Sequence, residues 1–219
     1  FEALRHLKLS IDRATVAVQG FGNVGMHTAL IMEQEGARVV AVSDVTGGLY
    51  NEKGLNIREL LDRYKTKGQT LRDTMMGDWI TNEELLRLPC TVLVPAALSE
   101  QITVHNAAAL RCRILAEGAN GPTTLEADRI LEDNGVFIIP DILANSGGVI
   151  VSYFEWVQDL QRFFWNETDI RKRLHDIITS AFHQTKLFAT EKRVSMRMAA
   201  LMNGIDKVAQ AHLQRGLYP

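Results

Sequence analysis

Short runs of β-branched and aliphatic residues alternate with longer helix-like segments from Thr15 to about Asp141. Strands are expected at residues 15–19, 38–43, 91–94, 113–116 and 136–139. Each run is dense in Val, Ile or Leu, which is typical of a strand buried on both faces. Strand–helix alternation of this kind predicts an α/β fold, in which helices cover both faces of a doubly wound, mainly parallel sheet.

Helix-like segments fill the intervals between these strands. They are expected at residues 24–35, 57–64, 82–87, 102–110 and 125–134. The last has a start signal, because Thr123 and Glu126 have capping-box spacing, and Gly135 stands where a C-terminal glycine is expected. After Ala144 the strand pattern ends, and three long helices are predicted at residues 144–164, 168–190 and 194–214.

Residues 15–25 read TVAVQGFGNVG, an apolar run that meets three glycines with the spacing G-x-G-x-x-G. This spacing alone is a weak signal, so its context decides what it means. A strand precedes it, a helix follows from Asn23, and Asp44 ends the second expected strand, 19 residues beyond Gly25. These are the conditions of a Rossmann-type dinucleotide-binding fingerprint. The alternative is a turn whose glycines serve packing alone.

Each glycine has its own role in that fingerprint. Gly20 permits the tight turn out of the strand, Gly22 lets the backbone approach a pyrophosphate, and Gly25 lets the helix pack closely on the sheet. The start of the helix then offers N–H groups and a partial positive charge to the phosphates.

Asp44 is the candidate for recognition of the ribose, since its carboxylate can accept hydrogen bonds from the ribose diol. The same residue precedes Thr46-Gly47-Gly48 and could instead cap a turn. A carboxylate here ordinarily repels a 2′-phosphate and favours NAD. Thr46 or a nearby lysine could change that balance, so NAD and NADP both stay open.

Composition limits the other classes of partner. The chain has 219 residues and a formal net charge of −2, so it has no broad basic field for nucleic acid or an anionic membrane. It has no apolar run near the roughly 18 residues that span a bilayer and no signal-peptide core, so we expect a cytoplasmic location. The missing initiator Met indicates a fragment of a longer chain.

Cys90 and Cys112 lack metal-ligand spacing, which predicts buried thiols and no metal site.

Three later stretches narrow the fold to a family: PAAL at 95–98, AEGANGPTT at 116–124 and PDILANSGGVIVSYFEW at 140–156. Together with VQGFGNVG and VAVSD, they closely resemble the C-terminal, nucleotide-binding domain of hexameric glutamate dehydrogenases. The resemblance runs from about Arg13 to the end of the chain. The related leucine, phenylalanine and valine dehydrogenases share the glycine loop and are the second choice. Ser146 is a departure, because Ala is expected there.

The resemblance implies a site for NAD or NADP and part of a substrate site. Asn120 would lie by the nicotinamide ribose, Asn145 by the carboxamide, and Ser152 would hydrogen-bond the distal carboxylate of the substrate, with Val149 beside it. The implied cofactor-binding residues are Gly20, Phe21, Gly22, Asn23, Val24, Gly25, Asp44, Val45, Ala96, Ala97, Asn120 and Asn145.

The positions of these residues support the assignment independently. Ala97 and Asn120 each follow an expected strand at its carboxyl end, where a doubly wound sheet binds ligands. Asn145, Val149 and Ser152 have the spacing i, i+4, i+7 of one helical face. Without the resemblance, Asn145 would be read as a helix cap and Ser152 as a surface hydroxyl.

The implied reaction is the reversible oxidative deamination of L-glutamate to 2-oxoglutarate and ammonia, with hydride transfer to the nicotinamide. In the family, the proton-transferring lysine and carboxylate come from an N-terminal substrate domain that this sequence lacks. No catalytic residue is therefore expected in this chain, and the fragment alone is expected to be inactive. A homohexamer is implied for the full-length protein. A non-catalytic regulatory subunit and a nucleotide-binding module without amino-acid chemistry stay open as alternatives.

Two further expectations concern domains and aromatic residues. We expect a dinucleotide-binding core over residues 1–155, with residues 156–219 forming helices that pack on it within the same domain. Asp141 follows an expected strand and could be an acid at the sheet end or the cap of a turn. A packed helix interface is the best interpretation of five aromatic residues, namely Phe154, Trp156, Phe163, Phe164 and Trp165.

Overall fold

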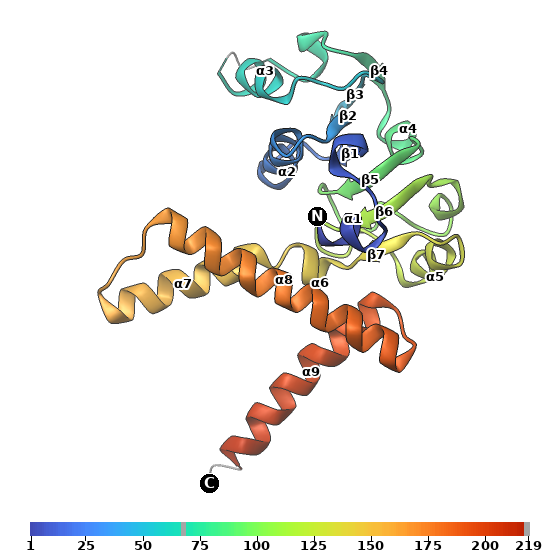
Figure 1. Cartoon of the computed structure of the whole chain (residues 1–219). Coiled ribbons are helices and arrows are strands. Elements are labelled where there is room, and N and C mark those ends of the chain that lie inside the picture. The colour runs from blue at the N-terminus through green and yellow to red at the C-terminus, as the bar shows by residue number, and fades with distance from the viewer. Residues whose placement is uncertain (67–68, 217–219) are drawn as a thin grey trace. The chain divides into compact units, whose positions relative to one another are not determined.

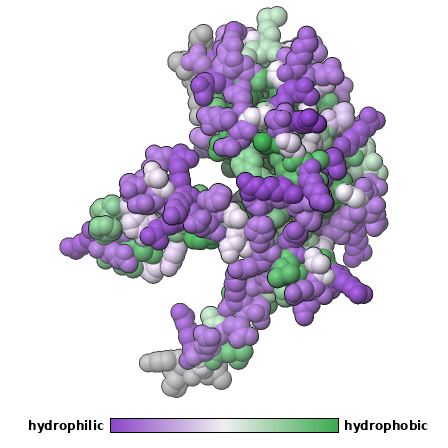
Figure 2. Space-filling model, in the orientation of Figure 1, coloured by the Kyte–Doolittle hydropathy of each residue, from purple (hydrophilic) through white to green (hydrophobic). Residues whose placement is uncertain are grey.

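The computed structural model describes residues 1–66 and 69–216, and the chain divides into two compact units (Figure 1). The first unit, Phe1–Asp141, contains every strand of the described residues, and the second, Ile142–Pro219, is helical. Hydrophilic atoms cover most of the surface in Figure 2, with hydrophobic patches between them. No helix in the described ranges combines the length and the apolar character that crossing a bilayer requires.

A seven-stranded sheet with the order β4-β3-β2-β1-β5-β6-β7 forms the centre of the first unit. The neighbouring strands β2, β1, β5, β6 and β7 pair in parallel. At one side of the sheet, β3 pairs antiparallel with both β2 and β4. The expected doubly wound, mainly parallel sheet is therefore confirmed. The strands are β1 (Thr15–Gln19), β2 (Arg38–Asp44), β3 (Gly47–Tyr50), β4 (Asp78–Ile80), β5 (Cys90–Pro95), β6 (Cys112–Ala116) and β7 (Phe137–Ile139).

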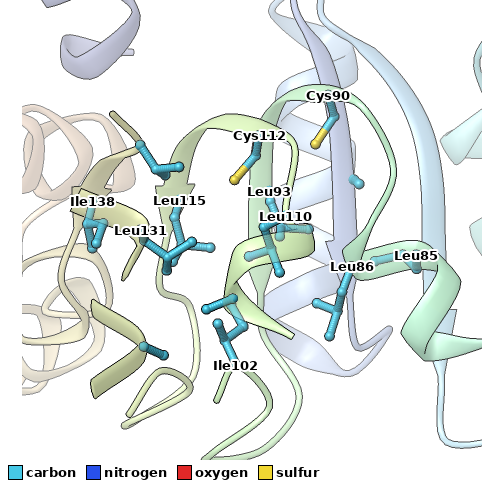
Figure 3. Close-up of a cluster of buried hydrophobic side chains, with 14 of the residues drawn as sticks. Leu85, Leu86, Cys90, Leu93, Ile102, Leu110, Cys112, Leu115, Leu131 and Ile138 are labelled. Atoms are coloured by element: carbon cyan, nitrogen blue, oxygen red, sulfur yellow. The ribbon is translucent and has the colours of Figure 1, made fainter. Parts of the chain in front are cut away.

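Helices cover both faces of this sheet (Figure 1). On one face α2 (Asn23–Gln34) packs against β1 and β2. On the other face α4 (Asn82–Leu86) and α5 (Leu125–Asp133) contribute to a core that also contains Leu93 and Leu115 of the central strands (Figure 3). Smaller elements are α1 (Glu2–His6), α3 (Ile57–Leu61) with a π-helical turn at Asp62–Thr66, and the 3₁₀ turns Ile11–Arg13 and Arg72–Thr74.

Both cysteines lie in this core, at the starts of β5 and β6, where Cys90 is the register partner of Cys112. Both thiols are free and buried. Burial raises the pKa of Cys112 to about 12, and burial together with the neighbouring thiol raises the pKa of Cys90 further. The thiolate is the reactive form of cysteine, so these side chains act as small hydrophobic residues.

The antiparallel edge was absent from the sequence expectations. β3 begins with Gly47-Gly48, which resembles a turn, and β4 has only three residues. The glycines are needed for packing, because a Cβ on Gly47 would lie 2.5 Å from the Trp79 ring. A strand without side chains at its start has no alternating apolar pattern that could reveal it.

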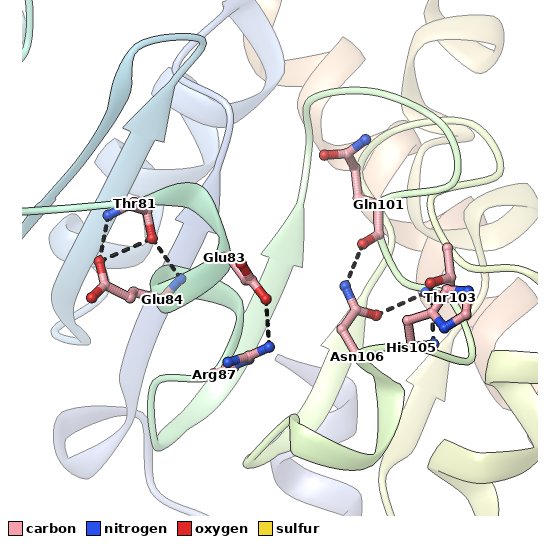
Figure 4. Close-up of polar contacts among 8 residues, drawn as sticks. All are labelled: Thr81, Glu83, Glu84, Arg87, Gln101, Thr103, His105 and Asn106. Carbon is pink, nitrogen blue, oxygen red and sulfur yellow. Dashed lines mark hydrogen bonds and ion pairs between the residues drawn. The ribbon is translucent and has the colours of Figure 1, made fainter.

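The helix expected at residues 102–110 is wrong. Ile102 instead forms an isolated bridge with Thr123, and only Ala107–Ala109 makes a 3₁₀ turn. The Asn106 side chain accepts from the Thr103 amide and donates to the Gln101 carbonyl, both at 2.8 Å (Figure 4). Short polar side chains that bond nearby backbone in this way compete with helix formation.

The helix expected after Pro122 is present, but its cap lies one residue later than the capping-box spacing suggested. Thr124 is the N-cap of α5, and its hydroxyl accepts from the Ala127 amide at 3.3 Å. The Thr123 hydroxyl is buried and has no hydrogen-bond partner among the residues that the structure describes. Thr123 instead pairs with Ile102 in an isolated bridge outside the seven strands, one residue before the cap.

The second unit consists of α7 (Gly147–Gln161), α8 (Glu167–Lys192) and α9 (Met196–Arg215), which confirms the three long helices. A short helix, α6 (Asp141–Ala144), precedes them, so α7 begins three residues later than expected. The Asn166 side chain caps α8 and the Ser195 side chain caps α9. The expected domain boundary at residue 155, and packing of the later helices on the core, stay predictions.

The packed aromatic cluster is only partly right. Phe154 is buried and meets the Trp165 ring edge-on, with ring centroids 5.5 Å apart. Arg173 covers Trp165 at 4.4 Å from its ring centroid. The other three side chains, those of Trp156, Phe163 and Phe164, are 58%, 67% and 72% exposed.

Candidate functional site

The glycine loop lies at the carboxyl end of β1, between β2 and β5 in the middle of the sheet. Gly20 has a φ of +94°, and a Cβ there would lie 2.7 Å from the Ala96 carbonyl oxygen. The Ala96 amide donates to the Gln19 carbonyl at 2.7 Å. Gly20 is thus required both by its left-handed backbone and by the close approach of the segment that follows β5.

Gly25 is required for a different reason. A Cβ on Gly25 would lie 1.8 Å from the Gly20 carbonyl oxygen, which would force α2 away from the loop. It would also lie 3.3 Å from the Val18 side chain on the sheet. This is the close helix–strand packing that the third glycine of the fingerprint allows.

Gly22 has neither requirement. Its φ of −80° and ψ of −167° suit any residue, and among the described residues no heavy atom beyond its chain neighbours lies within 4 Å of a Cβ built there. Gly22 is exposed and immediately precedes the first turn of α2. The first N–H groups of a helix have no intrahelical partner, so they face the same open space.

Of four residues around Gly22, one is buried and three are exposed to solvent. Phe21 is 2% exposed and meets the Tyr64 ring edge-on at 5.4 Å, so only its backbone can face a ligand. Asn23 and Val24 are exposed at the start of α2. His27 is also exposed, and its Nδ1 lies 2.7 Å from the Asn23 carbonyl, which agrees with a surface imidazole.

Asp44 ends β2 and caps the turn into β3. Its Oδ1 accepts from the Thr46 amide at 2.7 Å and from the Thr46 hydroxyl at 2.6 Å. Within the described residues its Oδ2 makes no hydrogen bond, so the turn cap leaves one carboxylate oxygen for a ligand. Val45 is 97% exposed on the same turn and offers an apolar surface beside that carboxylate.

The loops after β5 and β6 are joined at the same edge of the sheet. The amides of Gly118 and Ala119 both donate to the Pro95 carbonyl, at 3.0 and 2.9 Å. A Cβ on Gly118 would lie 3.1 Å from the Ala96 Cβ and 3.3 Å from the Val24 side chain. Gly118 therefore lets the second loop approach the start of α2. Ala97 and Asn120 are exposed on these loops.

Asp141 binds the loop that carries Asn120. Its carboxylate accepts from the Gly121 amide at 2.8 Å, and its own amide donates to the Glu117 carboxylate at 2.8 Å. Glu117 is fully buried. The contact with Gly121 supports the interpretation of Asp141 as an acid at the sheet end, and its role as a turn cap stays open. Sequence reasoning missed Glu117.

A second polar group missed by sequence reasoning lies beneath the glycine loop. The Ser43 hydroxyl donates to the Asn82 Oδ1 at 2.7 Å, and the Asn82 amide group donates to the Asp44 carbonyl at 2.8 Å. The Gly20 amide donates to the Ser43 Oγ at 3.4 Å. VAVSD contains Ser43 and Asp44, but no motif marked their contacts with Asn82, because Asn82 comes from a distant helix.

Comparison with known proteins decides the family. The model of the glutamate/leucine/phenylalanine/valine dehydrogenase family matches residues 1–216. This chain belongs to that family. The expected resemblance to its nucleotide-binding domain is thereby confirmed.

Individual relatives agree with the family match. The chain is 51% identical over 214 residues to the glutamate dehydrogenase of Thermotoga maritima, covering 96% of this chain and 51% of the relative. It is 46% identical over 215 residues to the cryptic catabolic NAD-specific glutamate dehydrogenase of Bacillus subtilis, covering 98% and 50%. The structure of the hetero-hexameric glutamate dehydrogenase from Thermus thermophilus, in its leucine-bound form, matches with a TM-score of 0.92 at 33% identity, covering 100% of this chain and 51% of that one. The chain spans about half the length of these relatives.

The remaining family-implied residues lie in the second unit. Asn145 stands in the turn between α6 and α7, so it does not continue the helix that carries Val149 and Ser152. Val149 is 70% exposed and Ser152 is exposed on α7. The Ser146 hydroxyl donates to the Leu143 carbonyl at 2.9 Å, so this departure from the family pattern is satisfied locally.

The expected site residues are divided between the two units. Eleven of the twelve expected cofactor-binding residues lie in the first unit, at the end of β2, in the loops after β1, β2, β5 and β6 or in the first turn of α2. Asn145 and the two expected substrate residues lie in the second unit. In the part of the chain that the structure describes, no group of three or more His, Cys, Asp or Glu side chains is arranged to hold a metal ion.

Proposed function

We propose that this chain is the NAD-binding domain of a glutamate dehydrogenase. The observation that carries the proposal is Gly22, where neither backbone geometry nor packing requires a glycine. Its missing side chain opens the space in front of the first turn of α2 at the carboxyl edge of the sheet. Helix N–H groups beside such a space fit a pyrophosphate.

We propose NAD in preference to NADP. The free Oδ2 of Asp44 can accept from a ribose hydroxyl, whereas a 2′-phosphate would meet a carboxylate whose position the Thr46 cap fixes. Relatives from Bacillus subtilis and Staphylococcus aureus are NAD-specific glutamate dehydrogenases, which supports the same choice. Val45 would lie against the adenosine.

When bound at this site, NAD would supply the acceptor for a hydride from the α-carbon of L-glutamate. The residues of this chain hold and orient: Asn120 and Asn145 would position the nicotinamide half, and Val149 and Ser152 would contact the substrate. We propose that proton transfer belongs to the part of the relatives' length that this chain does not span. This piece should bind the dinucleotide and show no glutamate-dependent reduction of NAD.

We propose a homohexamer as the assembly of the full-length protein. The Thermus thermophilus relative is a hexamer, although a hetero-hexameric one, which supports a hexameric assembly. Exposed apolar side chains on α9, including Leu201, Ile205 and Val208, support an interface that the isolated chain leaves uncovered. A regulatory subunit of the same fold stays the alternative, and a cytoplasmic location stays a prediction.

Parallel calorimetric titration with NAD and NADP tests the proposed function. We expect the wild-type chain to bind NAD more tightly than NADP. Asp44→Ser should weaken NAD binding by about tenfold and reduce its preference, because the ribose diol loses a charged acceptor. Equal affinities for both dinucleotides in the wild type would contradict the assignment of Asp44, and binding of neither would contradict the proposed function.

A further inference from the structure

We propose that Asn82 is a positioning residue that sets the preference for NAD over NADP, by tying the end of β2 to the glycine loop. The inference rests on the proposed function, since it concerns the same site. It assigns a role to a side chain on α4, which acts through Ser43 and Asp44.

The end of β2 needs an additional support at this point. The ladder between β1 and β2 ends at the pair Gln19–Ser43, one residue before Asp44, because β1 turns away at Gly20. The antiparallel partner of Asp44 is Gly47, which lacks a side chain and belongs to the sheet edge. The Asn82 amide group supplies a donor to the Asp44 carbonyl at 2.8 Å where the ladder has ended.

The other end of the Asn82 side chain reaches the glycine loop through Ser43. The Ser43 side chain is fully buried, its hydroxyl donates to the Asn82 Oδ1 at 2.7 Å, and its oxygen accepts from the Gly20 amide at 3.4 Å. One asparagine thus joins the strand end that carries the ribose-binding carboxylate to the turn that begins the phosphate-binding loop.

Asn82 itself is held firmly, although α4 has only five residues. Thr81 and Glu84 form a capping box at the start of the helix, in which the Thr81 amide donates to the Glu84 carboxylate at 2.7 Å and the Glu84 amide donates to the Thr81 hydroxyl at 3.1 Å (Figure 4). β4 leads directly into Thr81, and α4 packs against β1, β2 and β3. The asparagine therefore extends from a rigid element, as support for a binding site requires.

This geometry predicts a selective effect. Hydrogen bonding between the Asp44 carboxylate and a ribose diol needs the strand end to be held within about 0.5 Å of its place. NAD gains from that bond, and NADP does not, because its 2′-phosphate repels the carboxylate. Loosening the end of β2 should therefore weaken NAD binding and leave NADP binding almost unchanged.

The test is parallel calorimetric titration of NAD and NADP into the wild type, Asn82→Ala, Ser43→Ala and Asn106→Ala. Asn106 is the matched control, because its side chain also donates to a main-chain carbonyl at 2.8 Å and accepts a second hydrogen bond, but at residues 101–103. Asn82→Ala should weaken NAD binding roughly five- to tenfold and NADP binding less than about twofold. Ser43→Ala should shift the ratio in the same direction, and Asn106→Ala should leave it unchanged.

Equal weakening of both dinucleotides in Asn82→Ala, or an unchanged ratio, would overturn the inference while leaving the proposed function intact. If Asn82→Ala does not fold, an unchanged ratio in Ser43→Ala overturns it in the same way. A shifted ratio in Asn106→Ala would also overturn it, since the effect would then belong to any lost amide. A wild-type chain that binds neither dinucleotide would overturn the proposed function, and the inference with it.

Discussion

At the scale of single residues, the three glycines of the loop have three different physical causes. Position 20 requires glycine because of its positive φ, and position 25 because a Cβ would collide with the Gly20 carbonyl oxygen. At Gly22 no contact among the described residues requires a glycine. The first two follow from the fold, and only the third points to a ligand. The motif predicted all three glycines, whereas no motif predicted the bond between Ser43 and Asn82, because it joins a strand to a helix 39 residues away.

Gly25→Ala should therefore destabilise the chain. The added methyl group would collide with the Gly20 carbonyl, and overpacking of this kind costs about 1–3 kcal/mol. Gly204→Ala in α9 is the matched control, because a Cβ there meets nothing within 4 Å. It should stabilise the chain by about 0.5–1 kcal/mol through helix propensity. Urea unfolding measures both, and shifts of the same sign would contradict this account.

At the scale of elements, the buried parallel strands and long helices could be predicted, because each has a hydrophobic pattern of its own. Elements whose structure depends on something other than a hydrophobic pattern of their own could not be predicted. β3 pairs through glycines that carry no pattern, and the segment from Ile102 to Leu110 becomes irregular because Asn106 bonds its own backbone. The capping-box spacing placed the cap of α5 one residue too early, because Thr123 pairs with Ile102 in an isolated bridge and Thr124 is the cap.

The two threonines before α5 should respond in opposite ways. Thr124→Ala removes the helix cap and should lower the free energy of unfolding by about 1 kcal/mol. Thr123→Val replaces a buried hydroxyl that has no partner by a methyl group of similar shape, so it should be neutral or stabilising. Thermal unfolding of both variants checks this. A larger loss in Thr123→Val than in Thr124→Ala would show that Thr123 is the cap after all.

The capping box of α4 should make stability depend on pH. Hydrogen bonds from the Thr81 amide and hydroxyl lower the pKa of Glu84 below its ordinary value of 4.5. A carboxyl group with a lowered pKa stabilises the fold above its unfolded pKa, and this contribution is lost as the pH falls through the folded pKa. Glu84→Gln keeps an acceptor but does not titrate, so its melting temperature should fall less than that of the wild type between pH 5 and about pH 3. Parallel curves would contradict the assignment.

At the scale of the whole molecule, the chain joins a sheet unit that carries the expected cofactor-binding loops to a helical unit that carries the expected substrate residues. Apolar side chains are exposed along the helical unit, with Val149, Tyr153, Trp156 and Leu160 spaced along one face of α7. The packed aromatic interface expected from the sequence is therefore only partly formed within this chain. The sequence does not distinguish an apolar side chain that packs within this chain from one that another part of the protein covers. The exposed apolar surfaces could therefore not be predicted.

The most direct test of the central claim is calorimetric titration of NAD into the wild type and Gly22→Ala, with thermal unfolding measured on both. A Cβ at Gly22 meets no protein atom and requires no change of backbone, so the variant should unfold at nearly the wild-type temperature. The same Cβ would stand where the pyrophosphate approaches, so NAD affinity should fall by at least about tenfold. Wild-type affinity in a folded Gly22→Ala chain would contradict the claim that this open space receives the dinucleotide.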